Sequence, residues 1–143
     1  MRKTIFKNTQ GPFLTVYRLL KIGKLSICIH KFDQPDENPD CHDHPFHFFT
    51  MVLKGWYLEE FYNGDRKFRR MFSCGLRDAG CLHKVSACSK PVWTLCIKWD
   101  ANRRWGFMVR EEEGVIIKVK WVYWEDYIKA KGLTPISKSE EAY

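Results

Sequence analysis

The residues best suited to metal chemistry are three of the five histidines, His42, His44 and His47, which fall within six consecutive positions. On an extended strand, side chains two apart share a face, so His42 and His44 present two imidazoles side by side. His83, from a neighbouring strand, would complete a three-nitrogen site for one divalent transition metal ion, namely iron, zinc, manganese or nickel. Asp43 faces the other way on such a strand and is a poor ligand on geometry alone.

His47 has two interpretations. It lies three positions after His44, which puts it on the opposite face of a regular strand, but Pro45 can bend the chain between them. His47 is therefore either a fourth ligand or a histidine that supports the ligands. The alternative for the whole cluster is a surface loop of histidines between Pro39 and Pro45. We favour the metal, because inward-facing imidazoles without paired carboxylates need a partner for their nitrogens.

Short strands must carry these residues, and turn signals separate them. Residues 33–40 are rich in Pro, Asp and Asn and form a loop that delivers the histidines. Asn63-Gly64 predicts a type I′ hairpin turn. The apolar patterns predict strands over 25–30, 48–53, 57–62, 67–73, 92–99, 105–109 and 115–121, and a short C-terminal helix over 124–131 that stops at Gly132. This is an all-β fold, an antiparallel barrel or sandwich.

Length and composition predict one domain over residues 1–143, with flexible ends at 1–12 and 134–143. The chain is 45% hydrophobic and 15% aromatic, which favours a packed core over disorder. No apolar run reaches the roughly 20 residues that span a membrane. Lys7 and Pro12 interrupt any signal-peptide core, so we expect a cytoplasmic protein whose six cysteines are reduced.

The histidine spacing resembles the two motifs of the cupin superfamily. In the first motif a His-x-His pair precedes a glutamate and then a glycine. Here His42 and His44 match the pair and Gly55 matches the glycine, while Phe48 or Phe49 stands in place of the glutamate. The fourth ligand of the family is therefore missing.

In the second cupin motif a proline, a glycine and a histidine recur. Gly80 and His83 match the last two, and Asp78 stands where the proline usually lies. The resemblance implies a double-stranded β-helix, which is a jelly-roll barrel, and a three-histidine metal site as in the thiol dioxygenase branch. It also implies a homodimer, since cupins are often dimers.

A closer resemblance is to short, mostly uncharacterised cupin-like proteins of bacteria and their phages. It covers about residues 41 to 124, and its individual pieces are weak while their order and spacing are fairly specific. The matching segments are 42–46, 55–60, 82–85, 90–95, 104–107 and 121–124.

Five further residues are candidates for binding or catalysis. Tyr57 and Glu59 share one face of their strand and are candidate proton donors or acceptors near a metal-bound substrate. Arg70 and Arg104 are candidates for binding a substrate anion. Trp93 is a candidate stacking surface, with a place in the core as its alternative.

Three functions compete. The leading hypothesis is a small metal-dependent enzyme of dioxygenase, isomerase or lyase type that acts on a small anionic molecule, since the net charge of +7 favours anions. The second is a non-catalytic binding module, such as a phage accessory or counter-defence protein. The third is nucleic-acid binding through the arginines and aromatics of residues 66–72.

Overall fold

The computed structural model describes residues 1–8, 11–131 and 137–142. Short strands dominate these residues, in agreement with the all-β prediction. The elements are β1 (Arg2–Asn8), β2 (Gly11–Ile22), β3 (Leu25–Phe32), β4 (Phe46–Lys54), β5 (Tyr57–Phe61), β6 (Arg66–Arg69), β7 (Cys74–Arg77), β8 (His83–Cys88), β9 (Val92–Asp100), β10 (Gly106–Glu113), β11 (Ile116–Tyr123), α1 (Trp124–Ala130) and β12 (Ser137–Ala142).

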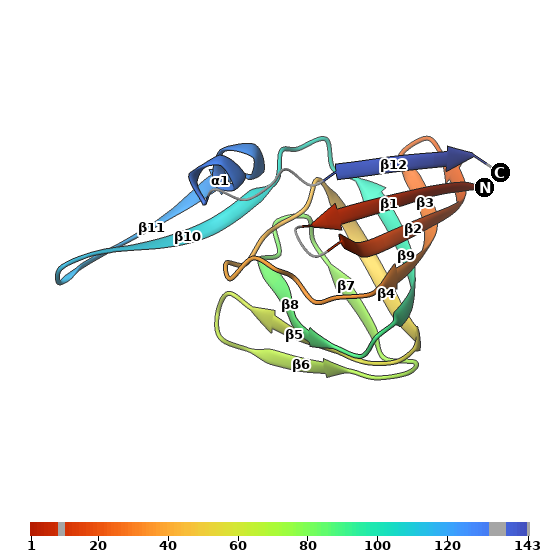
Figure 1. The fold of residues 1–143 in the computed structure, drawn as a ribbon, viewed down its shortest axis with the longest axis horizontal. Helices are drawn as coiled ribbons and strands as arrows, with labels where there is room; N and C mark the ends of the chain where they lie inside the picture. Colours follow the sequence, from red (N-terminus) through yellow and green to blue (C-terminus); the bar gives the residue numbers. More distant parts are fainter. Residues whose placement is uncertain (9–10, 132–136, 143) are drawn as a thin grey trace.

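Antiparallel pairing arranges these strands into three sheets. The largest has seven strands in the order β12-β1-β2-β3-β9-β4-β7, and it curls to face a three-stranded sheet in the order β6-β5-β8 (Figure 1). The remaining pair, β10 and β11, projects from the barrel as a long hairpin (Figure 1). The predicted double-stranded β-helix is confirmed.

Alternating side chains supply the core that holds the sheets together. Val52 and Val92 from the large sheet are fully buried and pack with Tyr57 of β5, which joins the two sheets across the barrel. A second cluster, of Val16, Cys28, Phe48 and Cys96, covers the inner face of the large sheet. These contacts fix the strands on which the histidines and their partners lie.

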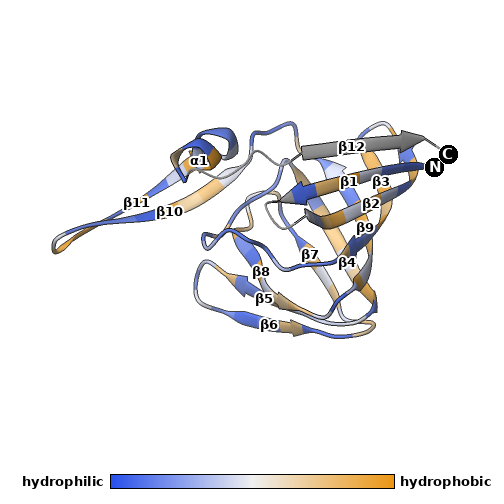
Figure 2. Ribbon diagram, viewed as in Figure 1, coloured by the Kyte–Doolittle hydropathy of each residue, from blue (hydrophilic) through white to orange (hydrophobic). Residues whose placement is uncertain are grey.

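The β10–β11 hairpin is held at its base by the predicted helix. Phe107 of β10 stacks on Tyr127 of α1, with ring centroids 3.9 Å apart. Beyond the helix the hairpin is open, and its tip is coloured as hydrophobic in Figure 2. Val115, between β10 and β11, is 99% exposed. The seven-residue α1 is the one helix of the described segments, so no helix there is long enough to cross a bilayer.

The described ends of the chain form strands, and flexibility of residues 1–12 and 134–143 stays a prediction. β1 pairs with β2 on one side and with β12 on the other, so both ends extend the large sheet. Their polar residues concealed this, because an edge strand needs only backbone partners on one side. Residues 132–136, which include the expected helix stop at Gly132, lie outside the described residues.

The type I′ turn predicted at Asn63-Gly64 is wrong. Gly64 has a φ of +94°, but Asn63 is not among the non-glycine residues with positive φ. Its side-chain oxygen instead accepts the backbone N–H of Asp65 at 3.0 Å. This local hydrogen bond favours a wider loop, and the strand expected over 67–73 is reduced to β6.

Candidate metal centre

Three histidines converge inside the barrel mouth. One ring nitrogen from each of His42, His44 and His83 lies within 4.8 Å of the others. The Nε2 atoms of His44 and His83 are 2.9 Å apart. His42 and His83 also exchange two backbone hydrogen bonds, of 2.9 and 3.0 Å, so the main chain brings the two histidine segments together before any ion binds.

The segment from Cys41 to His44 runs as an extra strand between β8 and β10. On the β10 side, the N–H of Asp43 donates to the carbonyl of Gly106 at 3.0 Å, and the N–H of Met108 donates to the carbonyl of Cys41 at 3.0 Å. Alternation therefore directs His42 and His44 inward and Asp43 to the other side.

Asp43 uses its carboxylate to anchor the hairpin instead of a metal. It is 3% exposed and accepts hydrogen bonds from the backbone N–H of Gly106 at 2.8 Å, from Arg103 at 2.7 Å and from the indole N–H of Trp121 at 3.0 Å. These three donors satisfy the buried charge. They also tie the histidine segment to the hairpin, which holds Trp105 over the site.

Behind His83 lies a fully buried glutamate. Glu59 is 0% exposed, and its Oε2 accepts the Nδ1–H of His83 at 2.6 Å. Arg69 and Arg77 each donate to the same carboxylate at 2.7 to 3.0 Å. A histidine whose Nδ1 holds a proton presents the lone pair of Nε2, which is the nitrogen that faces His44.

This network keeps Glu59 ionised. Burial acts to raise the pKa of its carboxyl group, but the hydrogen bonds from His83 and Arg77 outweigh burial and hold that pKa well below its usual range. Arg77 also donates to the hydroxyl of Tyr57 at 3.1 Å. Tyr57 and Glu59 thus share one buried network on the far side of His83 from His44.

Burial keeps the imidazoles of His42 and His44 neutral. It lowers the pKa of His42 to about 4 and lowers the pKa of His44 well below its ordinary value. Burial also lowers the pKa of His30, away from the site, well below its ordinary value. Neutral imidazoles are the form that binds metal ions.

Acidification of the metal-free protein is expected to destabilise it. In the unfolded chain His42 takes up a proton near pH 6.5, whereas in the folded chain it does so near pH 4. The unfolded state then binds more protons, so stability falls as the pH drops between these values. His42 alone predicts a loss of about 2 kcal/mol from pH 7 to pH 5.

Thermal unfolding of chelator-treated protein at several pH values measures this loss. The double variant His42→Gln and His44→Gln should show a flatter dependence on pH. An unfolding temperature that is equal at pH 7 and pH 5 in the unmodified chain would contradict neutral imidazoles at His42 and His44.

Aromatic rings surround the three histidines. The ring of Phe48 lies 4.8 Å from that of His44, at one of the two positions where the cupin motif has its glutamate. Trp105 lies 6.2 Å from His42 and 6.5 Å from His44. The site is thus walled by apolar groups, which lower its polarity and limit its contact with water.

The other candidate residues lie elsewhere. The Nδ1 atom of His47 accepts the backbone N–H of Ala79 at 2.9 Å, and its side chain is 48% exposed, so the structure does not bring it to the other three histidines. Trp93 stacks on Tyr17 with centroids 6.0 Å apart. Arg104 covers the ring of Tyr123 at 3.7 Å.

The arginines at the site differ from Arg70 and Arg104, which the sequence suggested. Arg70, directly after β6, is exposed, while its neighbour Arg69 points inward to Glu59. Arg77 is 5% exposed and was not selected at all. Strand alternation from Glu59 could have indicated Arg69, but the pairing of Glu59 with Arg77 depends on long-range packing.

The donor set fits a divalent transition metal ion. Two nitrogens bound to one such ion at tetrahedral angles lie about 3.3 Å apart, close to the separation of the His44 and His83 nitrogens. His42, His44 and His83 would hold the ion, and three protein nitrogens leave coordination positions open. A buried carboxylate on the far nitrogen of a ligand histidine is a common companion of such sites.

The chain resembles known proteins in structure but not in sequence. No protein-family model and no curated protein matches it. Its structure resembles a sugar phosphate isomerase of the cupin superfamily from Silicibacter pomeroyi, with a TM-score of 0.55 and 13% identity over 85% of this chain and 87% of that chain.

Two further structures are similar. The Fe(II) form of HppE has a TM-score of 0.57 and 12% identity, over 68% of this chain and 56% of HppE, just over half of its length. A protein from Ralstonia eutropha JMP134, provisionally assigned as a mannose-6-phosphate isomerase, has a TM-score of 0.53 and 21% identity over 68% of this chain and 85% of that chain. The chain therefore has a cupin-like fold.

Proposed function

We propose that the protein is a small metal-dependent enzyme that holds one divalent transition metal ion on His42, His44 and His83 and acts on a small anionic molecule. One observation carries this proposal. Three imidazoles converge, and the Nδ1 of His83 is held by a buried carboxylate, which leaves its inward nitrogen to bind a metal ion. Iron, zinc, manganese and nickel all accept such ligands.

The nature of the substrate is inferred from charge and from the similar structures. The net charge of +7 favours anions. The similar proteins include a sugar phosphate isomerase and a hydroxypropylphosphonic acid epoxidase. By their names, the first acts on a phosphate and the second on a phosphonic acid. We therefore infer a substrate that carries a phosphate, phosphonate or carboxylate group.

Each part of the site has a role in this proposal. When bound, the metal ion supplies Lewis acidity and open coordination positions. Glu59 orients His83, and we assign it as a positioning residue in place of the proton donor or acceptor considered from the sequence, because its carboxylate is engaged by His83, Arg69 and Arg77. Tyr57 supports Arg77 in the same network. Trp105 and Phe48 exclude water from the site.

Cobalt spectroscopy is the experiment that tests this function. The Co²⁺-loaded protein is expected to show visible absorption bands that change when methylphosphonate or acetate is added, because the anion enters an open coordination position. The double variant His42→Ala and His44→Ala should show neither the bands nor the change. Bands that no anionic probe alters would indicate a closed structural site, and hence a binding module.

A further inference from the structure

The three-stranded sheet has a second face, which points away from the barrel interior. Tyr57 and Glu59 of β5 point into the barrel, so the alternate positions point outward. The strand registers place Leu58 beside Phe68 of β6, and Glu60 beside Arg66 of β6 and Lys84 of β8. We call this side of the sheet the outer face. It comprises Trp56, Leu58, Glu60, Tyr62, Arg66, Phe68, Arg70 and Lys84.

Three aromatic rings are open to solvent on the outer face. Trp56 is 38% exposed, Tyr62 is 49% exposed and Phe68 is 58% exposed. Trp56 and Phe68 stack on each other, with centroids 5.4 Å apart and an interplanar angle of 29°. Exposing such rings is unfavourable in water, and a stacked pair offers a flat surface for another planar group.

The backbone holds Trp56 in place. Its N–H donates to the hydroxyl of Ser89 at 2.9 Å, and its carbonyl accepts the N–H of Ser89 at 2.9 Å. Gly55, with a φ of +84°, is required before it, because a Cβ there would lie 2.4 Å from the Ser89 hydroxyl oxygen. The aromatic surface is therefore preorganised, which lowers the cost of binding.

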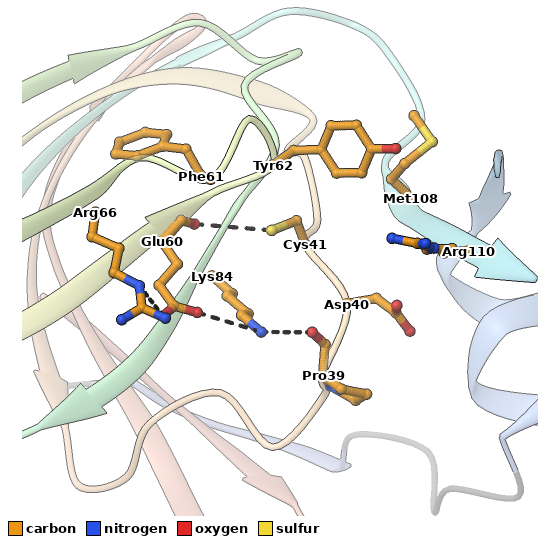
Figure 3. Close-up of a pocket in the computed structure, with 11 residues that line it drawn as sticks. Pro39, Asp40, Cys41, Glu60, Phe61, Tyr62, Arg66, Lys84, Met108 and Arg110 are labelled. Carbon is orange, nitrogen blue, oxygen red and sulfur yellow. Dashed lines mark hydrogen bonds and ion pairs between the residues drawn. The ribbon is translucent and has the colours of Figure 1, made fainter. Parts of the chain in front are cut away.

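A cavity of about 250 Å³ lies at the other end of the outer face (Figure 3). The hydroxyl of Tyr62 points across it toward Met108 and Arg110 of β10 (Figure 3). Cys41 and Asp40 also line it (Figure 3). The cavity thus has an aromatic ring on one side and a guanidinium group on the other.

On the outer face three cations, Arg66, Arg70 and Lys84, outnumber the one acid, Glu60. Arg66 and Lys84 both bind the carboxylate of Glu60, at 2.9 and 3.5 Å, and so neutralise it. Arg70 adds one more positive charge, and Arg110 lines the cavity. The nearby acids already have partners. Asp40 accepts a hydrogen bond from the hydroxyl of Tyr127 at 2.7 Å, and Asp65 accepts one from the side chain of Asn63 at 3.1 Å. Glu112 forms an exposed ion pair with Arg110 at 3.2 Å. Exposed pairs of this kind are weak and open readily.

We propose that the outer face binds single-stranded nucleic acid. One base stacks on the Trp56–Phe68 pair, a second enters the cavity beside Tyr62, and Arg66 and Lys84 between them contact the phosphates. Trp56 and Tyr62 are six residues apart along an extended chain, or about 20 Å, which suits a short run of nucleotides. Aromatic rings interleaved with cations along a strand bind single strands in this way.

Lipid headgroups would present similar negative charge but do not suit this surface as well. Insertion into a bilayer favours contiguous apolar side chains. Here the stacked rings are separated from Tyr62 by the charged group of Glu60, Arg66 and Lys84. The outer face is also separated from the histidines by the sheet itself, so nucleic-acid binding is independent of the proposed metal function.

Fluorescence anisotropy with labelled oligothymidylate and oligouridylate tests the proposal. Binding is expected at low salt, with a slope of log affinity against log salt of about −1.4 for the two phosphate contacts of Arg66 and Lys84. Phe68→Ala and Tyr62→Ala are each expected to weaken binding by about fivefold to hundredfold. Lys84→Ala should reduce the salt slope by about 0.7.

Matched controls lie on the other sheet. Trp99, which is 53% exposed on β9, and the exposed Lys21 on β2 should be replaceable by alanine without effect on oligonucleotide affinity. If the controls lost as much oligonucleotide affinity as the variants of the outer face, the proposal would be overturned, because binding would not depend on that face. Absence of oligonucleotide binding at low salt would also overturn it, and so would binding to phosphatidylserine vesicles alone.

Discussion

Replacing His83 with alanine is expected to abolish the binding of a divalent metal ion. His83 supplies one of three converging nitrogens, and it alone among them is tied through its far nitrogen to a buried carboxylate. The remaining pair, His42 and His44, would form a weak chelate. Elemental analysis of the purified variant, with calorimetric titration of Zn²⁺ into the chelator-treated protein, measures the loss.

His47 provides the matched control for this experiment. It belongs to the same histidine cluster, but its nitrogen is occupied by the backbone N–H of Ala79 and half of its side chain is exposed. His47→Ala should therefore keep about one metal ion per chain, as a three-nitrogen site would hold. Full metal content in His83→Ala, or its loss in His47→Ala, would mean that the ligands are assigned wrongly.

Local patterns made the barrel and the convergence of three histidines predictable. Two histidines at strand spacing share a face whatever the rest of the chain does, because alternation is a property of the backbone. The glycine before His83 and the resemblance to the cupin motifs then indicated which distant strand would lie beside them. The hairpin of β10 and β11 was predictable for a similar reason, since its strands are adjacent in sequence.

The surroundings of the histidines were less predictable, because they depend on partners that are distant in the chain. Asp43 meets Arg103 and Trp121 only after the hairpin folds over the histidine segment. Arg77 reaches Glu59 from a strand of the opposite sheet. The pattern of charges alone cannot distinguish buried Arg69 from exposed Arg70 without the register of β5 and β6.

Replacing Glu59 with glutamine is expected to weaken both the fold and metal binding. An amide nitrogen cannot accept the hydrogen bonds that His83, Arg69 and Arg77 donate to the carboxylate. Two buried guanidinium groups would then lack their counter-charge, at a cost of about 3–5 kcal/mol of stability. Loss of the hydrogen bond that orients His83 should reduce metal affinity by about 10- to 100-fold.

The variant Glu60→Gln is the control that distinguishes these effects from a general loss of negative charge. It is the next residue on the same strand but lies half-buried on the outer face, where it pairs with Arg66 and Lys84. Glu60→Gln should cost less than about 1 kcal/mol, because exposed ion pairs contribute little, and should leave metal affinity unchanged. Thermal unfolding and Zn²⁺ titration compare the two variants, and nitrogen NMR of the imidazoles reports whether His83 still carries its proton on Nδ1. If Glu59→Gln binds metal as tightly as the unmodified chain with that proton still on Nδ1, Glu59 does not position His83, and its burial serves the packing of the two arginines alone.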